Sequence, residues 1–204
     1  MSYSSFTAKK LKEQFGITQA FERKLFADVK AVKASKWLKH SLDKNADFAV
    51  MQGSEKARSE FIIAPVLAEL REIADGKISL FSGVRFDVDK SQKLEGISDF
   101  LISRSPDQAV LDAPVVVAVE AKRQDFEKGI AQCVAEMYAA RIFNDRKNSN
   151  IKDIYGCVTI GNGWQFLILK ENKAIIEPTI FDLNEDLERI LGILYAMSLG
   201  LIPE

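Results

Sequence analysis

The stretch that decides the fold is Val115-Val116-Val117-Ala118-Val119-Glu120-Ala121-Lys122. It opens with a short, bounded and mostly β-branched apolar run, which is typical of a strand buried in the middle of a sheet. Because side chains alternate along a strand, Glu120 and Lys122 point to one face and Ala121 to the other. Two charges at the end of a buried strand are costly unless they are paired or open into a cleft.

The flanking sequence predicts an α/β protein with a central mixed β-sheet flanked by helices. Ser54 can cap a long helix in which Pro65 is expected to produce a kink. The tight turn Gly161-Asn162-Gly163 predicts a hairpin. The predicted elements, in order, are a helix at 54–74, strands at 77–89, 97–103 and 115–121, a helix at 125–143, strands at 154–160, 164–169 and 174–181, and a helix at 183–199.

The chain has 204 residues, which favours one main domain with a small addition. Residues 1–50 are interpreted as a helical N-terminal extension, with short helices at 6–15 and 35–48. Residues 51–204 are interpreted as the main domain.

Composition excludes several classes of function. The single histidine, His40, lies in a lysine-rich stretch, so a Ser-His-Asp or Cys-His mechanism is disfavoured. Two cysteines, Cys133 and Cys157, do not make a disulfide framework. No apolar run reaches the length of a membrane helix and no export signal is evident, so no membrane association and a cytoplasmic location are expected. Carboxylates and lysines must therefore carry any chemistry.

The net charge is −1, but basic residues are concentrated near the start of the chain. The basic arm, residues 9–44, is compatible with a polyanionic partner or with a partner-binding role. A solvated helical face explains the same pattern, and both interpretations stay open.

A second carboxylate, Asp99, lies among apolar residues in the preceding strand. If strands 97–103 and 115–121 are neighbours, Asp99 lies beside Glu120. Paired carboxylates suit a hard divalent cation such as Mg²⁺, which keeps waters that can attack a phosphodiester. Lys122 could orient that water or neutralise charge on the phosphate. The alternative is a surface ion pair between Glu120 and Lys122.

The helix at 54–74 adds a third carboxylate. Its apolar stripe comprises Ile63, Leu67, Leu70 and Ala74, at spacings of three and four. Extending the stripe back by three residues predicts that Glu60 faces the core.

Glu60, Gly96-Ile97-Ser98-Asp99 and Glu120-Ala121-Lys122 together resemble the PD-(D/E)xK, or restriction-endonuclease-like, nuclease superfamily. The resemblance is greatest to Holliday-junction resolvases and to the N-terminal nuclease domain of type I restriction R subunits. It covers residues 54–171 and includes the aromatic hairpin at 155–166. Ser98 stands where the proline of the superfamily name would be.

The resemblance implies a restriction-endonuclease-like core and metal-dependent hydrolysis of DNA, or of RNA. It implies that Asp99, Glu120 and the Ala121 carbonyl ligate Mg²⁺, with Mn²⁺ as a substitute. Lys122 would then serve the attacking water and Glu60 would complete the site. Gln132, on the following helix, is also carried over. Cleavage of both strands favours a homodimer. The alternative is that the same fold serves as a non-catalytic module that binds nucleic acid or a partner protein.

Overall fold

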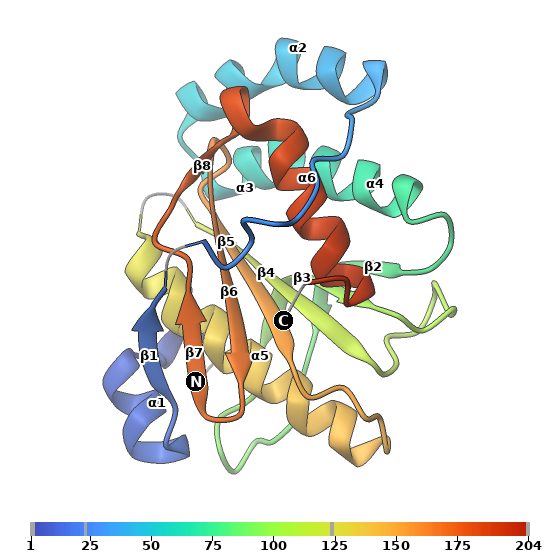
Figure 1. Ribbon diagram of the computed structural model, residues 1–204. Helices are drawn as coiled ribbons and strands as arrows, with labels where there is room; N and C mark the ends of the chain where they lie inside the picture. The colour runs from blue at the N-terminus through green and yellow to red at the C-terminus, as the bar shows by residue number, and fades with distance from the viewer. Residues whose placement is uncertain (1–2, 23, 123–124, 203–204) are drawn as a thin grey trace.

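The described strands form one eight-stranded mixed sheet with helices on both faces (Figure 1). The computed structural model describes residues 3–22, 24–122 and 125–202. The strand order is β1-β7-β6-β5-β4-β3-β2, and β8 pairs with β6 outside this path. The predicted α/β class, with a central mixed sheet flanked by helices, is therefore confirmed.

The elements follow the predicted order closely. The strands are β1 (Thr18–Phe21), β2 (Ser79–Arg85), β3 (Ile97–Ser103), β4 (Val115–Ala121), β5 (Ile154–Thr159), β6 (Gly163–Lys170), β7 (Lys173–Ile176) and β8 (Phe181–Asp182). The helices are η1 (Tyr3–Ser5), α1 (Ala8–Phe15), α2 (Lys36–Gln52), α3 (Glu55–Arg58), η2 (Ser59–Ile63), α4 (Ala64–Ile73), α5 (Phe126–Arg146) and α6 (Leu183–Leu199). The single strand predicted at 174–181 is divided between β7 and β8.

Strand β4 is buried along its whole length near the middle of the sheet. It pairs antiparallel with β3 and parallel with β5. The predicted hairpin, β5–β6, is present, and β2 and β3 also pair antiparallel. The end of β4 therefore lies between the start of β3 and the end of β5.

Each face of the sheet covers its own hydrophobic core. On one face, α5 and α1 pack over residues such as Leu101 and Ala118. On the other face, α4 and α6 pack over residues such as Val117 and Val119. Side chains that alternate along β4 thus enter two different cores, so Glu120 belongs to the α5 side.

Two glycines let α5 approach the sheet closely. A Cβ at Gly129 would lie 2.6 Å from a methyl of Val158 and 3.0 Å from Cγ of Lys122. A Cβ at Gly156 would lie 2.6 Å from the sulfur of Met137. Because glycine has no side chain, the α5 backbone can lie against the ends of β4 and β5.

The segment before residue 50 is not helical throughout. Helices α1 and α2 form as predicted, and Ser35 caps α2. Between them, β1 joins the sheet edge in parallel with β7. This strand was missed because Thr18–Phe21 is short and only half buried, so its pattern carries little signal.

The chain between β1 and α2 crosses helix α6 (Figure 1). The Arg189 guanidinium on α6 donates to the carbonyls of Phe26 and Val29. The backbone N–H of Val32 donates to the Glu188 carbonyl at 2.8 Å. These bonds hold the N-terminal segment against the main sheet.

Pro65 disturbs the helix that contains it, though not where the kink was predicted. The π-helical segment η2 comes directly before α4, in which Pro65 is at the first turn. Proline lacks an N–H and its ring crowds the carbonyl four residues earlier, at Phe61. The wide π turn accommodates the proline without ending the helix.

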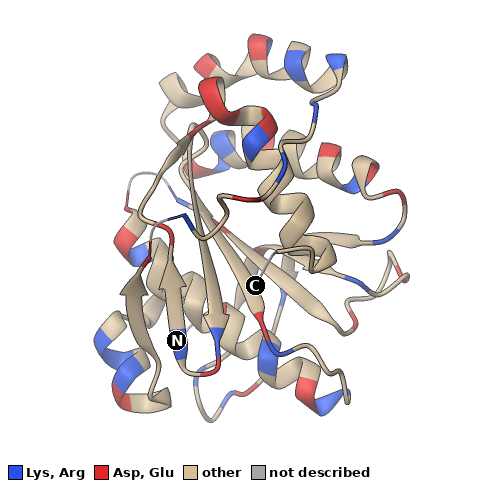
Figure 2. Cartoon of the chain, in the orientation of Figure 1, with Lys and Arg blue, Asp and Glu red and all other residues tan. Residues whose placement is uncertain are grey.

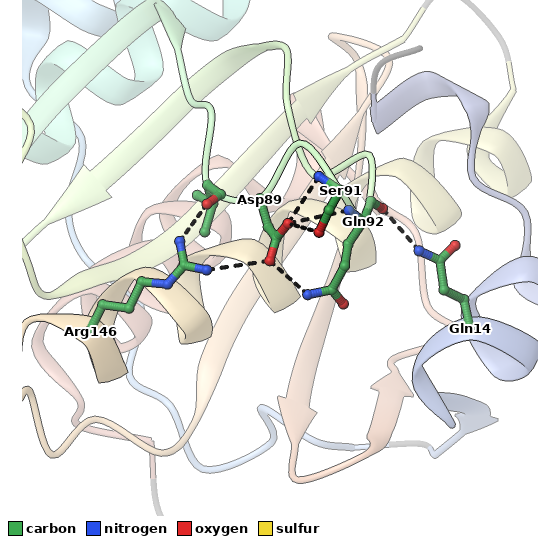
Figure 3. A network of polar contacts seen from close by, with 6 residues as sticks. Gln14, Asp89, Ser91, Gln92 and Arg146 are labelled. Carbon is green, nitrogen blue, oxygen red and sulfur yellow. Dashed lines mark hydrogen bonds and ion pairs between the residues drawn. The ribbon is translucent and has the colours of Figure 1, made fainter.

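The loop that leads into β3 is tied to two helices (Figure 3). Asp89 accepts hydrogen bonds from Ser91 and Gln92, which lower its pKa to about 2. Arg146 at the end of α5 pairs with Asp89 at 3.3 Å, and Gln14 of α1 donates to the Gln92 carbonyl. The start of β3 is thereby held in place.

Charged residues lie mainly on the helices and loops, whereas the strands are mostly uncharged (Figure 2). Parts of the basic arm are neutralised, as in the pair between Lys39 and Glu188 at 2.8 Å. Among the described helices, none combines the length and the apolar character needed to cross a membrane.

Gly192 of α6 tests the docking of the N-terminal segment. A Cβ there would collide with the backbone carbonyl of Lys30 and lie 3.0 Å from Cα of Ala31. Because backbone cannot move aside as a side chain can, Gly192→Ala is expected to lower the free energy of unfolding by about 2 kcal/mol or more. Urea denaturation measures the change. The exposed Glu185→Ala on the same helix should change it by about 0.5 kcal/mol at most, and equal stability of the two variants would contradict the packing.

Candidate functional site

Asp99 and Glu120 meet at the end of β4. The β3–β4 register pairs Phe100 with Val119, so Asp99 comes opposite Glu120. The Asp99 carboxylate accepts a hydrogen bond from the backbone N–H of Ala121 at 2.9 Å. The N–H and carbonyl of one strand residue point to the same side, so the Ala121 carbonyl also faces the β3 edge. The structure thus brings these three groups together.

A chain of polar contacts joins β4 to α5. The Lys122 ammonium pairs with the Glu120 carboxylate. It also donates to the side-chain oxygen of Gln132 at 3.1 Å. The Gln132 amide in turn donates to Glu136 at 3.3 Å. Gln132 therefore lies within the cluster, in contact with Lys122.

The Glu120 side chain is deeply buried, at 0% exposed, which excludes a surface ion pair with Lys122. Lys122 lies nearer the surface, with 18% of its side chain exposed, and Gln132 is 8% exposed. Besides the ion pair with Lys122, the Glu120 carboxyl group lies within hydrogen-bonding reach of the carboxyl groups of Asp99 and Glu136. The structure thus places a buried carboxyl group at the base of the cluster.

Three carboxyl groups in this cluster hold their protons unusually strongly. Burial raises the pKa of Glu120 well above its usual range, and the charges of Glu136 and Asp99 raise it further. Burial also raises the pKa of Glu136, against the hydrogen bond from Gln132. The pKa of Asp99 is raised by burial too, although the Ala121 N–H opposes the shift. A positive charge added among them would stabilise their ionised forms.

Lys122 remains positively charged in this environment. Burial lowers its pKa, but the charges of Glu120 and Glu55 outweigh that effect and raise the pKa overall. Glu55, at the start of α3, thus lies close enough to act on the Lys122 ammonium. Gln132 on α5 accepts a hydrogen bond from the same ammonium.

Glu60 does not reach the cluster, so its predicted position was wrong. Its side chain is 53% exposed and pairs with Lys56 at 2.7 Å. The buried positions of the helix step by five residues across η2, from Ala57 to Ile62 and from Arg58 to Ile63. Within η2 the wider turn puts Arg58, five residues before Ile63, on the buried face, so a step of three back from Ile63 leaves that face and reaches Glu60.

Two residues of the cluster were missed from the sequence. Glu136 shares a helix face with Gln132, four residues away, and that spacing could have marked it. Glu55 could have been found only by allowing for the π-helical step. Glu136 adds a further buried carboxyl group to the cluster, and the charge of Glu55 raises the pKa of Lys122.

The donor atoms are all oxygen, which suits a hard divalent cation. Within the described residues, no group of three or more His, Cys, Asp or Glu side chains could hold a metal ion. Mg²⁺ is commonly held by one or two carboxylates and keeps several waters. Asp99, Glu120 and the Ala121 carbonyl match that smaller ligand set.

A comparison with protein-family models and with curated proteins finds no significant match to this sequence. The interpretation of the cluster therefore rests on its chemistry.

The carboxyl cluster predicts how stability depends on pH. In the folded protein the pKa of Glu136 lies above its ordinary value of 4.5. Above about pH 4.5 the unfolded chain releases this proton while the folded protein retains it. The contribution of the proton to the free energy of unfolding therefore decreases as the pH rises, and it is lost once the pH passes the folded pKa. Without divalent cations, the Tm should fall between about pH 5 and about pH 8.

Glu136→Gln supplies the test, because glutamine resembles the protonated acid and does not titrate. The variant should show a smaller fall in Tm over the same pH range, measured by calorimetry in the presence of EDTA. The exposed Glu60→Gln is the matched control and should keep the wild-type slope. Identical slopes in all three proteins would show that Glu136 is not held protonated.

Proposed function

We propose that this protein is a metal-dependent nuclease that hydrolyses phosphodiester bonds in DNA. The observation that carries the proposal is the convergence of Asp99, Glu120 and Lys122 at the end of one buried strand. Buried charges are retained at such a cost chiefly where they bind or react. DNA is favoured by the resemblance stated above, and RNA is the second substrate to test.

The order of elements supports a restriction-endonuclease-like core. A helix at residues 55–73 is followed by three antiparallel strands, β2 to β4. Helix α5 then leads to β5, which is parallel to β4. This is the helix–three strands–helix–strand arrangement that the resemblance implies, and it places the acidic strand end beneath the start of α5.

Asp99, Glu120 and the Ala121 carbonyl would hold Mg²⁺, for which Mn²⁺ could substitute. When bound, the cation supplies a water activated for attack and neutralises charge on the phosphate. Asp99 is fixed for this role by the Ala121 N–H. The raised pKa values of Asp99 and Glu120 imply that both carboxyl groups release protons as a cation binds.

Lys122 would orient the attacking water and stabilise negative charge that develops on the phosphate. Gln132 holds the ammonium on one side through its side-chain oxygen. The charge of Glu55 helps to raise the pKa of Lys122, after that of Glu120. Glu55 is the acidic residue of this helix that we propose in place of Glu60.

A second candidate function is a non-catalytic module that binds nucleic acid or a partner protein. The observation that favours it is the complete burial of Glu120 beneath Lys122. In such a module, the ion pair between Glu120 and Lys122 would have only a structural role, and divalent cations would not bind at this strand end.

Metal binding and cleavage separate the two functions. In the nuclease, Mn²⁺ binds the wild type in calorimetry and supports cleavage of a labelled DNA duplex, a branched DNA or an RNA. Glu120→Gln should abolish metal binding, and Lys122→Met should lower the cleavage rate by about 100-fold or more while metal binding is kept.

Two acidic residues of one helix form the matched pair for this experiment. Glu55→Gln should reduce cleavage by about tenfold, because it weakens the field around the Lys122 ammonium. Glu60→Gln should cleave as the wild type does. Metal binding that survives Glu120→Gln, or a wild type that neither binds metal nor cuts any of the substrates, would favour the non-catalytic module.

A further inference from the structure

Arg58, in helix α3, is a buried cation without a carboxylate partner among the described residues. Its side chain is only 8% exposed. One terminal nitrogen donates to the backbone carbonyl of Ile160. The Nε atom is buried and has no hydrogen-bond partner in the part of the chain that the structure describes.

This arrangement is costly for the folded protein. A guanidinium carries five N–H donors and cannot release its charge. Burying a charge without an ionic partner costs several kcal/mol, and a single bond to a carbonyl offsets only part of that cost. A purely structural contact with Ile160 would not require a permanent charge.

Arg58 lies beside the candidate active site. Ile160 follows Thr159, whose carbonyl accepts a hydrogen bond from the Lys122 N–H at 2.8 Å. On α3, Glu55 is one turn before Arg58, and Glu55 acts on the Lys122 ammonium. The bond to the Ile160 carbonyl, next to Thr159, therefore places the guanidinium near the end of β4.

The Arg58 stem is also held rigidly. Gly161 packs against it, since a Cβ on that glycine would lie 3.5 Å from both Cβ and Cγ of Arg58. Gly161 has a φ of +90°, which glycine adopts readily and other residues rarely do. The guanidinium is thus held by the turn between β5 and β6 and by the carbonyl of Ile160. Its other nitrogens still carry N–H groups that can donate hydrogen bonds.

We propose that Arg58 binds a backbone phosphate of the nucleic acid adjacent to the one that is cleaved. A guanidinium donates charge-assisted hydrogen bonds to a phosphate, whose negative charge would compensate the unpaired positive charge of Arg58. The inference rests on the proposed function, because the bound anion is part of the same substrate. Arg58 positions the strand over Lys122 and takes no part in bond breaking.

The test measures the affinity for a DNA duplex and its dependence on salt, with Ca²⁺ in place of Mg²⁺ so that the substrate stays intact. Arg58→Met keeps the apolar stem and removes the charge. It should weaken binding about tenfold and reduce the salt slope by about one counterion. Arg58→Lys keeps a charge without the planar fork, so its affinity should be intermediate.

The matched control is Arg71→Met, which removes the same charge from an exposed position on α4, further along the continuous helix. It should leave both the affinity and the salt slope near the wild-type values. Calorimetric unfolding shows whether each variant is folded, and Arg58→Lys keeps the test informative if Arg58→Met is not.

The outcomes separate this inference from the proposed function. If the wild type binds DNA and Arg58→Met binds with the same salt slope, Arg58 contacts no phosphate and the proposed function is unaffected. If the wild type binds neither the DNA duplex nor an RNA of the same length, both proposals are wrong. Weaker binding with a reduced slope in Arg58→Met alone supports the phosphate contact.

Discussion

The structure of this strand end depends on one constraint, the cost of placing the Glu120 carboxyl group inside the protein. Strand β4 is buried on both faces, so a charge at its end has no access to bulk water. Lys122 offsets part of that cost, and Gln132 holds Lys122 in place. The close approach of α5, which Gly129 permits, keeps water out and the pKa of Glu120 high.

Much of the fold could be predicted because its strongest patterns are local. The β-branched run in β4, the turn at Gly161–Gly163 and the cap at Ser54 each specify one element through nearby residues. Short elements with few buried residues gave weaker signals. Strand β1 forms only because β7 offers it an edge to pair with, a partner more than 150 residues away.

Strand geometry made the carboxyl pair of the site predictable, and Gln132 on α5, named from the resemblance, also lies in the cluster. The two-residue period of β3 and β4 brings Asp99 beside Glu120, so their meeting follows from register. Ordinary α-helical spacing gave the wrong position for Glu60. The π turn before Pro65 inserts a five-residue step, and the apolar pattern of the sequence does not reveal it. Glu55 takes the position near Lys122 for the same reason. A proline inside an amphipathic helix therefore indicates that the apolar face cannot be extended across it at spacings of three and four.

The two unusual charges of this region have opposite sign and a common explanation. Burial, together with the neighbouring carboxyl groups, raises the pKa of Glu120, and burial raises that of Glu136, so these groups retain protons. Arg58 lies on one side of the same strand end, and no carboxylate among the described residues compensates its positive charge. If the two charges served only the fold, pairing them with each other would relieve both costs. Their separation instead suits two ligands of opposite charge, a divalent cation at the carboxylates and a phosphate at the guanidinium, which a metal-dependent nuclease must hold side by side.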